Sequence, residues 1–242
     1  MKISIVLIIS LAFSIVGYSQ SYYLEAGING STHRVEDYSF RQLDMNTLKF
    51  GYQIGLFCEA EISNRLYFIS GLYFVRKGAY LNRTLANYYL ANDFPYRIPE
   101  DPTTQEPLDP ERTLTIHPED LKSIMVNYLE MPLSLKFFMP INELRPYVLF
   151  GSYLSLNLSG TLELKEGANS ENPDNNLSIG AGKLSVWDIG LVSGIGIQQG
   201  KFDFALKYSH GILDVFWSRN TNTYQGVFNS TFTISLAYRL GE

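Results

Sequence analysis

Three histidines, His33, His117 and His210, are the residues best suited to acid–base chemistry in this sequence. His210 follows Ser209 in the stretch YSHG, and Asp214 comes four residues later. A serine, a histidine and a carboxylate could form the site of a lipid-modifying enzyme, with the histidine activating the serine. Neighbouring strand residues point to opposite faces, however, so Ser209 and His210 are not a natural pair. We therefore expect no catalytic activity and keep His210 as a weak candidate.

The sequence gives no sign of a metal, a cofactor or nucleic acid as a ligand. No histidines, cysteines or carboxylates have the spacing of a zinc site, and no glycine-rich phosphate loop precedes a helix. The glycines of GIGIQQG (194–200) fall within an expected strand, where they suit a closely packed wall. The formal net charge of −5 gives no electrostatic reason to expect nucleic acid.

A second group of chemically active residues consists of charged side chains inside otherwise alternating apolar runs. They are Glu25, Glu59, Arg76, Glu130, Lys136, Asp188, Asp203, Lys207 and Arg239. If the runs are strands of a narrow barrel, these side chains face its interior. An unpaired charge there is unfavourable, so we expect clusters of mixed sign. Their role is structural, filling and stiffening the barrel, and a proton or ion path is the alternative.

Eight runs have the period of two that is typical of strands, and none has a convincing helical period. They cover residues 22–29, 48–60, 66–76, 124–138, 145–159, 186–198, 202–211 and 228–240. In the last run, TFTISLAYRL, every second residue is large and apolar. The sequence therefore predicts an all-β protein.

The connections between these runs alternate between long and short. The segments 61–65, 139–144 and 199–201 are short, and 30–47, 77–123, 160–185 and 212–227 are long. In an up-and-down antiparallel barrel, this pattern places all short turns and both termini at one rim. Bacterial outer-membrane barrels have this layout, with short periplasmic turns and long extracellular loops. Six prolines exclude the segment 77–123 from the sheet, and PEDLKSIMV (118–126) suggests a short helical turn.

The apolar face of each strand decides whether the barrel is soluble or spans a membrane. The opposite faces carry glycines and charges, which fit a narrow interior, whereas bulky Phe and Leu side chains would overfill it. We therefore expect the apolar face to meet lipid, with Cys58 on that face. The marker residues are Leu133, Leu135, Phe204, Leu206, Phe232, Ile234 and Leu236. Strand direction places Glu25, Glu59, Lys136, Asp203 and Arg239 in the periplasmic half, and Arg76, Glu130, Asp188 and Lys207 in the outer half.

The first nineteen residues have the features of a cleaved secretory signal peptide. Lys2 precedes an apolar run of about a dozen residues, which is short for a membrane-spanning helix of about 20 residues. Small residues, Gly17 and Ser19, follow. We expect a signal peptide at 1–19 and one barrel domain at 20–242. The aromatic content of 14% suits aromatic girdles at two membrane interfaces.

Four blocks, in order, resemble the PorT-type outer-membrane β-barrel family. They are GYQIGLFCEAEISNRLYFISGLYFVRKGA (51–79), YLEMPLSLKFFMPINELRPYVLFGSYLSLNLSG (128–160), VWDIGLVSGIGIQQGKFDFALKYSHGILDV (186–215) and FNSTFTISLAYRL (228–240). The resemblance covers almost the whole mature chain except the long loops, and it implies an eight-stranded outer-membrane barrel. One branch of that family is tied to a protein-secretion and gliding apparatus. The ending YRLGE departs from the terminal aromatic residue of many such barrels, and Tyr238 could take its place.

Together these observations predict a non-enzymatic protein of the outer membrane of a Gram-negative bacterium, with both termini in the periplasm. Its expected role is structural or interactive, through extracellular loops that contact a partner protein, a polysaccharide or outer-membrane lipid. A secretion or envelope complex is one setting for such a role. A lipid-modifying enzyme at the outer rim is the alternative, and small-solute transport is a further one.

Overall fold

Antiparallel strands make up almost all of the described chain. The structure, a computed structural model, describes residues 21–37, 40–41, 48–81, 121–139, 144–165, 176–177, 179, 184–215 and 226–241. The predicted signal peptide, His117 and most of the segment 77–123 lie outside these residues and stay predictions.

Eight long strands and two short ones form the sheet. The long strands are β1 (Ser21–Asp37), β3 (Lys49–Ser63), β4 (Leu66–Tyr80), β5 (Leu121–Phe138), β6 (Arg145–Leu164), β8 (Trp187–Gln199), β9 (Phe202–Gly211) and β10 (Gly226–Leu240). The short ones, β2 (Phe40–Arg41) and β7 (Asn176–Leu177), pair with the far ends of β1 and β6. All eight predicted strands are therefore present.

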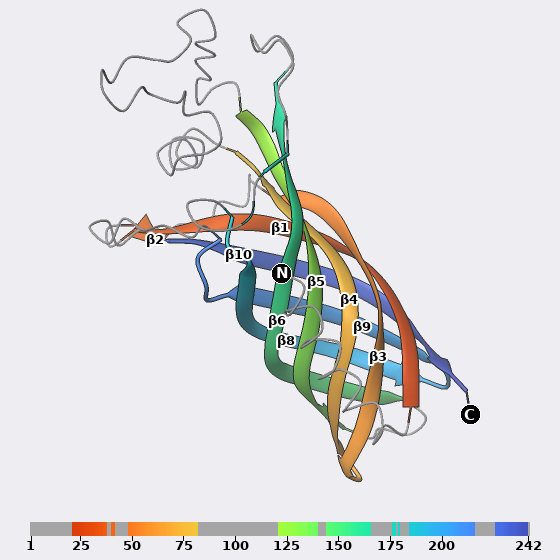
Figure 1. Cartoon of the computed structure of the whole chain (residues 1–242). Coiled ribbons are helices and arrows are strands. Elements are labelled where there is room, and N and C mark those ends of the chain that lie inside the picture. Colours follow the sequence, from red (N-terminus) through yellow and green to blue (C-terminus); the bar gives the residue numbers. More distant parts are fainter. Residues whose placement is uncertain are drawn as a thin grey trace, which may run out of the picture.

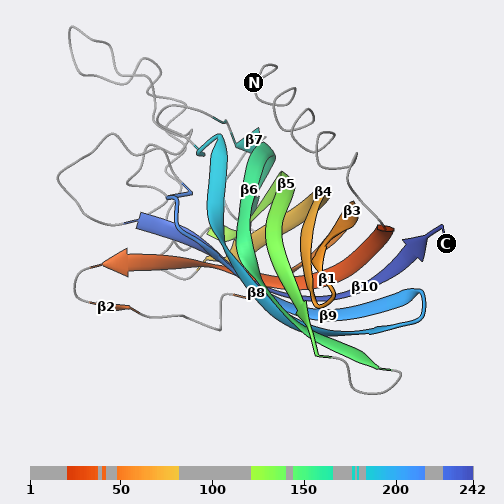
Figure 2. The same ribbon diagram turned by 90° about the horizontal axis from the view of Figure 1, so that it is seen from below.

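The long strands form a closed ring in the order β1, β3, β4, β5, β6, β8, β9, β10. Every pairing in the ring is antiparallel, and β10 returns to pair with β1 over its whole length (Figures 1 and 2). Closure pairs the backbone groups of every strand, which is what an apolar solvent requires. The predicted eight-stranded up-and-down barrel is confirmed.

The two ends of the barrel differ in their connections. At the end we call the short-turn end, β3 joins β4 through two residues, and β8 joins β9 through Gly200 and Lys201. Gly200 has a φ of 58°, a left-handed conformation that glycine adopts at little cost. β1 begins and β10 ends at this same end, as Figure 1 shows. The opposite end, the long-loop end, carries the four longer connections.

Several strands extend further toward the long-loop end than the sequence predicts. β1 continues to Asp37 instead of residue 29, and β6 continues to Leu164 instead of residue 159. The expected helical turn at 118–126 is wrong for its described part, because 121–126 belongs to β5 and pairs with β4 and β6. Inward-facing Ile124 and Val126 continue the alternation of β5 and are fully buried, which favours a strand. In the described part of the chain, no helix is long and apolar enough to cross a membrane.

The outer face of the barrel is apolar. Of the seven lipid-facing markers, Leu135, Phe204, Leu206, Phe232, Ile234 and Leu236 are exposed by 40–62%. Leu133 is half-buried on the same face of β5. Cys58 lies opposite exposed Tyr22 but is itself buried, with its thiol 3.3 Å from the Ser70 carbonyl oxygen. A predominantly apolar surface of this kind fits hydrocarbon and not water.

Candidate functional site in the barrel interior

A buried lysine joins two carboxylates in the short-turn half of the interior. Alternation along β3, β5 and β9 turns Glu59, Lys136 and Asp203 inward, and each is 1–3% exposed. Lys136 Nζ donates to Glu59 Oε1 at 2.5 Å and also to Asp203. These residues form the Lys136 cluster. The sequence analysis placed all three in this half, and the structure brings them together.

Tyrosines and a glutamine complete the hydrogen bonding of the Lys136 cluster. Tyr23 donates its hydroxyl to Glu59 at 3.0 Å, and Tyr147 donates to Asp203 at 2.6 Å. Gln198 donates in turn to the Tyr23 hydroxyl at 2.6 Å. A buried ion pair is stable only when its remaining lone pairs are satisfied, and these groups satisfy them. Sequence reasoning missed these three residues, and their inward parity is the only signal that could have found them.

A second ion pair lies near the middle of the barrel. Lys207 on β9 donates to Glu25 on β1. Gln53 donates to the same carboxylate at 2.7 Å, and Tyr73 donates to its other oxygen at 2.8 Å. Strand direction had placed Lys207 in the outer half and Glu25 in the periplasmic half. The structure instead makes them one pair that connects the two halves.

The third cluster, in the long-loop half, contains a residue that the sequence analysis missed. Lys77 on β4 is 1% exposed, and its Nζ lies 2.6 Å from Glu130 and 3.9 Å from Asp188. Ser155 donates to Glu130 at 2.9 Å, and Asn229 donates to Asp188 at 2.9 Å. We call Lys77, Glu130 and Asp188 the Lys77 cluster.

The prediction that Arg76 faces the interior is wrong. Tyr73 and Val75 are inward-facing and buried, so alternation on β4 turns Lys77 inward and Arg76 outward. The Val75–Tyr128 pair lies inside, and the next pair, Arg76 with Asn127, lies outside. Parity counted along FISGLYFVRK would have selected Lys77, because the alternation of β4 continues unbroken past Val75.

A further ion pair lies beyond the part of the barrel that the hydrocarbon can enclose, near the far end of β6. Lys49 Nζ lies 2.7 Å from Glu163, and Ser123 donates to the same oxygen at 2.5 Å. Glu163 is 18 residues beyond the start of a strand that needs about 9–11 to cross a bilayer. The hydrogen bonds from Lys49 and Ser123 hold the pKa of Glu163 below its usual range.

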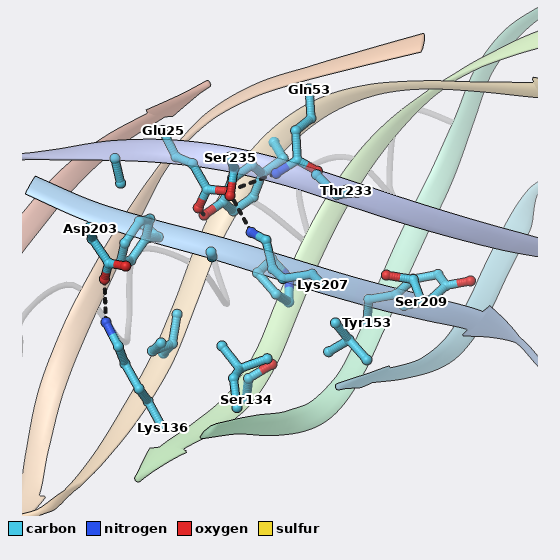
Figure 3. A pocket seen from close by; sticks show the side chains of 18 of the residues that line it. Glu25, Gln53, Ser134, Lys136, Tyr153, Asp203, Lys207, Ser209, Thr233 and Ser235 are labelled. Atoms are coloured by element: carbon cyan, nitrogen blue, oxygen red, sulfur yellow. Dashed lines mark hydrogen bonds and ion pairs between the residues drawn. The ribbon is translucent and has the colours of Figure 1, made fainter. Parts of the chain in front are cut away.

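A small cavity of about 50 Å³ lies between the Lys136 cluster and the Glu25–Lys207 pair (Figure 3). Its walls include both ion pairs drawn in that view, together with Ser209 and Tyr153. A polar cavity of this size holds a few water molecules. It therefore has room for a few water molecules between ion pairs and is too small for a drug-sized ligand.

Packed side chains fill the interior toward both ends. Toward the long-loop end lies an inward-facing apolar layer, the apolar plug. It consists of Ala79, Leu81, Leu121, Ile124, Val126, Tyr128, Leu162, Leu184, Val215 and Val227. Toward the short-turn end, Phe138 packs edge-on against Tyr67 and Tyr147, and the Arg145 guanidinium lies 4.1 Å from the Phe138 ring centre. We call these four residues the Phe138 layer. Arg239, on the inward parity of β10, lies beside Tyr23 and is partly exposed.

The histidines and their neighbours do not assemble a nucleophilic site in the described chain. Ser209 lines the interior cavity, whereas His210 lies on the outer face. Arg34 Nη2 lies 2.7 Å from His210 Nε2, and the Tyr208 hydroxyl lies 3.3 Å from Nδ1. His33 is buried in β1. Among the residues described, no three or more His, Cys, Asp or Glu side chains are grouped to hold a metal ion.

Comparison with known proteins agrees with this architecture. The family model described as "Outer membrane protein beta-barrel domain" matches residues 18–217. No curated protein matches the chain.

Similar solved structures include small barrels from several bacteria. Neisserial surface protein A has 11% identity and a TM-score of 0.41, with 90% of this chain and 97% of that chain covered. The attachment invasion locus protein Ail of Yersinia pestis has 16% identity and a TM-score of 0.37, with 91% of this chain and 98% of that chain covered. A major outer membrane protein from Thermus thermophilus has 12% identity and a TM-score of 0.45, with 91% of this chain and 98% of that chain covered.

The family model covers most of the chain, and the closed antiparallel ring with an apolar exterior is the architecture that the family name describes. The chain therefore belongs to the outer membrane protein β-barrel domain family and is a barrel of the outer membrane.

Proposed function

We propose that this barrel is a non-enzymatic structural and interaction protein of the outer membrane. The filled interior is the observation that carries the proposal. Three ion clusters occupy the lumen, the apolar plug closes it toward one end, and the cavity between the Lys136 cluster and the Glu25–Lys207 pair is only about 50 Å³. A barrel filled in this way is a rigid support, and its contacts with other molecules are made at its ends and its outer surface.

The long-loop end is, on this proposal, the end that faces the outside of the cell. Both termini of the strand ring lie at the short-turn end, and short turns face the periplasm in outer-membrane barrels. The segment between β4 and β5, residues 81–120, carries six of the ten prolines. It is then the main extracellular connection and the proposed contact for a partner protein or polysaccharide. The PorT resemblance favours a partner within a secretion or envelope complex.

Deleting residues 85–115 tests this role, because these residues lie between β4 and β5 and outside both strands. We expect the shortened protein to keep its folded, heat-modifiable mobility on gels. We also expect it to lose a cross-linked partner that the full chain captures in intact cells. If the deletion variant captures the same partner in the same amount, the proposed role of this connection is wrong.

The lipid-modifying alternative depends on His210, which the structure places on the outer face with Arg34 and Tyr208 as partners. Ser209 lies on the other face, within the lumen. We therefore expect cells that carry His210→Ala to have an unchanged profile of lipid A species. A specific lipid A species that disappears in this variant, with barrel abundance unchanged, would favour the enzyme.

Small-solute transport needs a continuous water path through the barrel. The apolar plug and the Phe138 layer fill the interior toward its two ends and would block such a path. We expect no conductance steps when the folded barrel is inserted into a planar bilayer. Steps that persist after repeated purification, and whose size changes in a Val126→Ala variant of the plug, would favour transport.

A further inference from the structure

On β4, β5 and β6, the outward rows change from apolar to polar at one particular step. Cross-strand partners share a face, and the row Phe74, Leu129 and Leu156 is apolar. The next outward row toward the long-loop end is polar. It consists of Arg76, Asn127 and Ser159.

The spacing along β4 places this polar row at the edge of the hydrocarbon. β4 begins at the short-turn end with Leu66, and its outward positions include Phe68, Leu72 and Phe74 before Arg76. A tilted strand crosses the hydrocarbon in about 9–11 residues, and residues 66 to 76 span that length. The same interval on β5 runs from Phe137 to Asn127. The polar row therefore lies at the level of lipid head groups.

A β-bulge places the serine in this row. Asn127 pairs with Ser159, whereas the neighbouring Tyr128 pairs with Asn157, so Leu158 is the extra residue. Without the bulge, Leu158 would lie opposite Asn127. Asn127 Nδ2 donates to the Ser159 hydroxyl oxygen at 2.9 Å. The hydroxyl hydrogen of exposed Ser159 is then available for an acceptor outside the protein.

Arg76 supplies the positive charge of the row. The carboxylates of the three interior clusters are on the opposite face of the sheet, and among the residues described none forms an ion pair with Arg76. Outward-facing Tyr52 and Phe74 lie next to it, with ring centres 6.1 Å apart. An anionic partner stabilises a guanidinium at the edge of hydrocarbon, and the planar donors of the guanidinium match a phosphate.

We propose that Arg76, Asn127 and Ser159 bind the phosphate group of a membrane lipid in the leaflet at the long-loop end. Arg76 donates to the phosphate oxygens, and the Ser159 hydroxyl, oriented by Asn127, donates a further hydrogen bond. The acyl chains lie along Phe74 and Leu129 in the row below. A free phosphate ion lacks this apolar contact, so the site requires the lipid.

Native mass spectrometry of the folded barrel in non-ionic detergent tests the proposal. The probes are dimyristoyl phosphatidylglycerol and a glucosyl dimyristoylglycerol, which has the same chains and no phosphate. We expect the barrel to retain the phosphatidylglycerol preferentially. Arg76→Gln should weaken its binding about tenfold, Arg76→Lys should weaken it less, and Ser159→Ala should weaken it about threefold.

The matched control is Arg65→Gln, which removes an exposed arginine from the turn at the other end of the same strand. It should leave binding unchanged, and all variants should keep heat-modifiable mobility. Equal binding of the two lipids, or equal binding by wild type and Arg76→Gln, would overturn the site. Inorganic phosphate that binds as tightly as the lipid and is lost in Arg76→Gln would show an ion site and would overturn the lipid assignment.

Discussion

At the scale of single residues, the interior depends on lysines that lie between carboxylates. Lys136 is fully buried, and both of its carboxylate partners also accept hydrogen bonds from tyrosines. Such an arrangement contributes little net stability compared with an apolar core. Losing one partner from it is much more damaging, because the remaining charges are left buried and unpaired.

Replacing Lys136 by methionine tests this arrangement. Glu59 and Asp203 would then lose the cation that they share, so we expect the free energy of unfolding in urea to fall by about 3–5 kcal/mol. Lys201→Met, at an exposed turn position, is the control and should change it by less than about 0.5 kcal/mol. Adding Glu59→Gln and Asp203→Asn to Lys136→Met should restore part of the loss. A triple variant no more stable than Lys136→Met would contradict the ionic explanation.

Glycines beside the inward tyrosines offer a second test at this scale. A Cβ on Gly55 would lie 2.5 Å from Tyr73 Cδ1, and Tyr73 is one of the residues that donate a hydrogen bond to Glu25. We expect Gly55→Ala to lower the unfolding free energy by about 1–3 kcal/mol through overpacking. Gly30→Ala is the control, because its Cβ would meet only Leu48 at 3.6 Å. Equal unfolding midpoints for the two variants would show that Gly55 has no packing role.

At the scale of strands, the period of two was enough to locate all eight ring strands and the outward apolar face. It also placed Glu59, Lys136 and Asp203 in the same half of the interior, where the structure joins them in one cluster. Alternation, however, fixes only the face of a residue, not its partner across the lumen. The Glu25–Lys207 pair depends on strand tilt and register, which no local pattern contains.

The errors in strand length have one physical cause. The sequence analysis ended strands where polar residues or prolines became frequent. In the structure, the strands extend as far as their inward side chains are buried against other side chains. Beyond Tyr128, inward Val126 and Ile124 have such a core in the apolar plug, so β5 begins at Leu121. On β4 the error is one of parity, because the alternation of buried Tyr73 and Val75 turns Lys77, and not Arg76, into the interior.

The position of the apolar belt predicts how much stability is lost when an outward residue is replaced by arginine. The loss should depend strongly on the height of that residue along the barrel. Ile234 is 62% exposed in the middle of the apolar belt of β10, and Ile62 is 57% exposed at the short-turn end of β3. Ile234→Arg should lower the unfolding free energy in lipid vesicles by about 2–4 kcal/mol, since it places a charge near the bilayer midplane. Ile62→Arg should have little effect, because this residue lies near the water. Similar losses in both variants would contradict the assigned position of the belt.

At the scale of the whole molecule, the barrel reverses the usual arrangement of a soluble protein. Its exterior is apolar, its interior is ionic, and the apolar plug and the Phe138 layer separate that interior from both ends. The family assignment, the lipid-phosphate site and the proposed support function all require this orientation of the sheet.

Site-directed spin labelling of β10 measures that orientation directly. Single cysteines are placed at each position from 231 to 240 in a Cys58→Ser background, and the folded protein is reconstituted in lipid vesicles. We predict that oxygen, which concentrates in hydrocarbon, reaches the labels most readily at 232, 234, 236 and 238, and that a water-soluble nickel chelate does not reach these positions. Maximum oxygen access at 233, 235 and 237, or nickel access at the even positions, would show that the apolar face does not meet lipid.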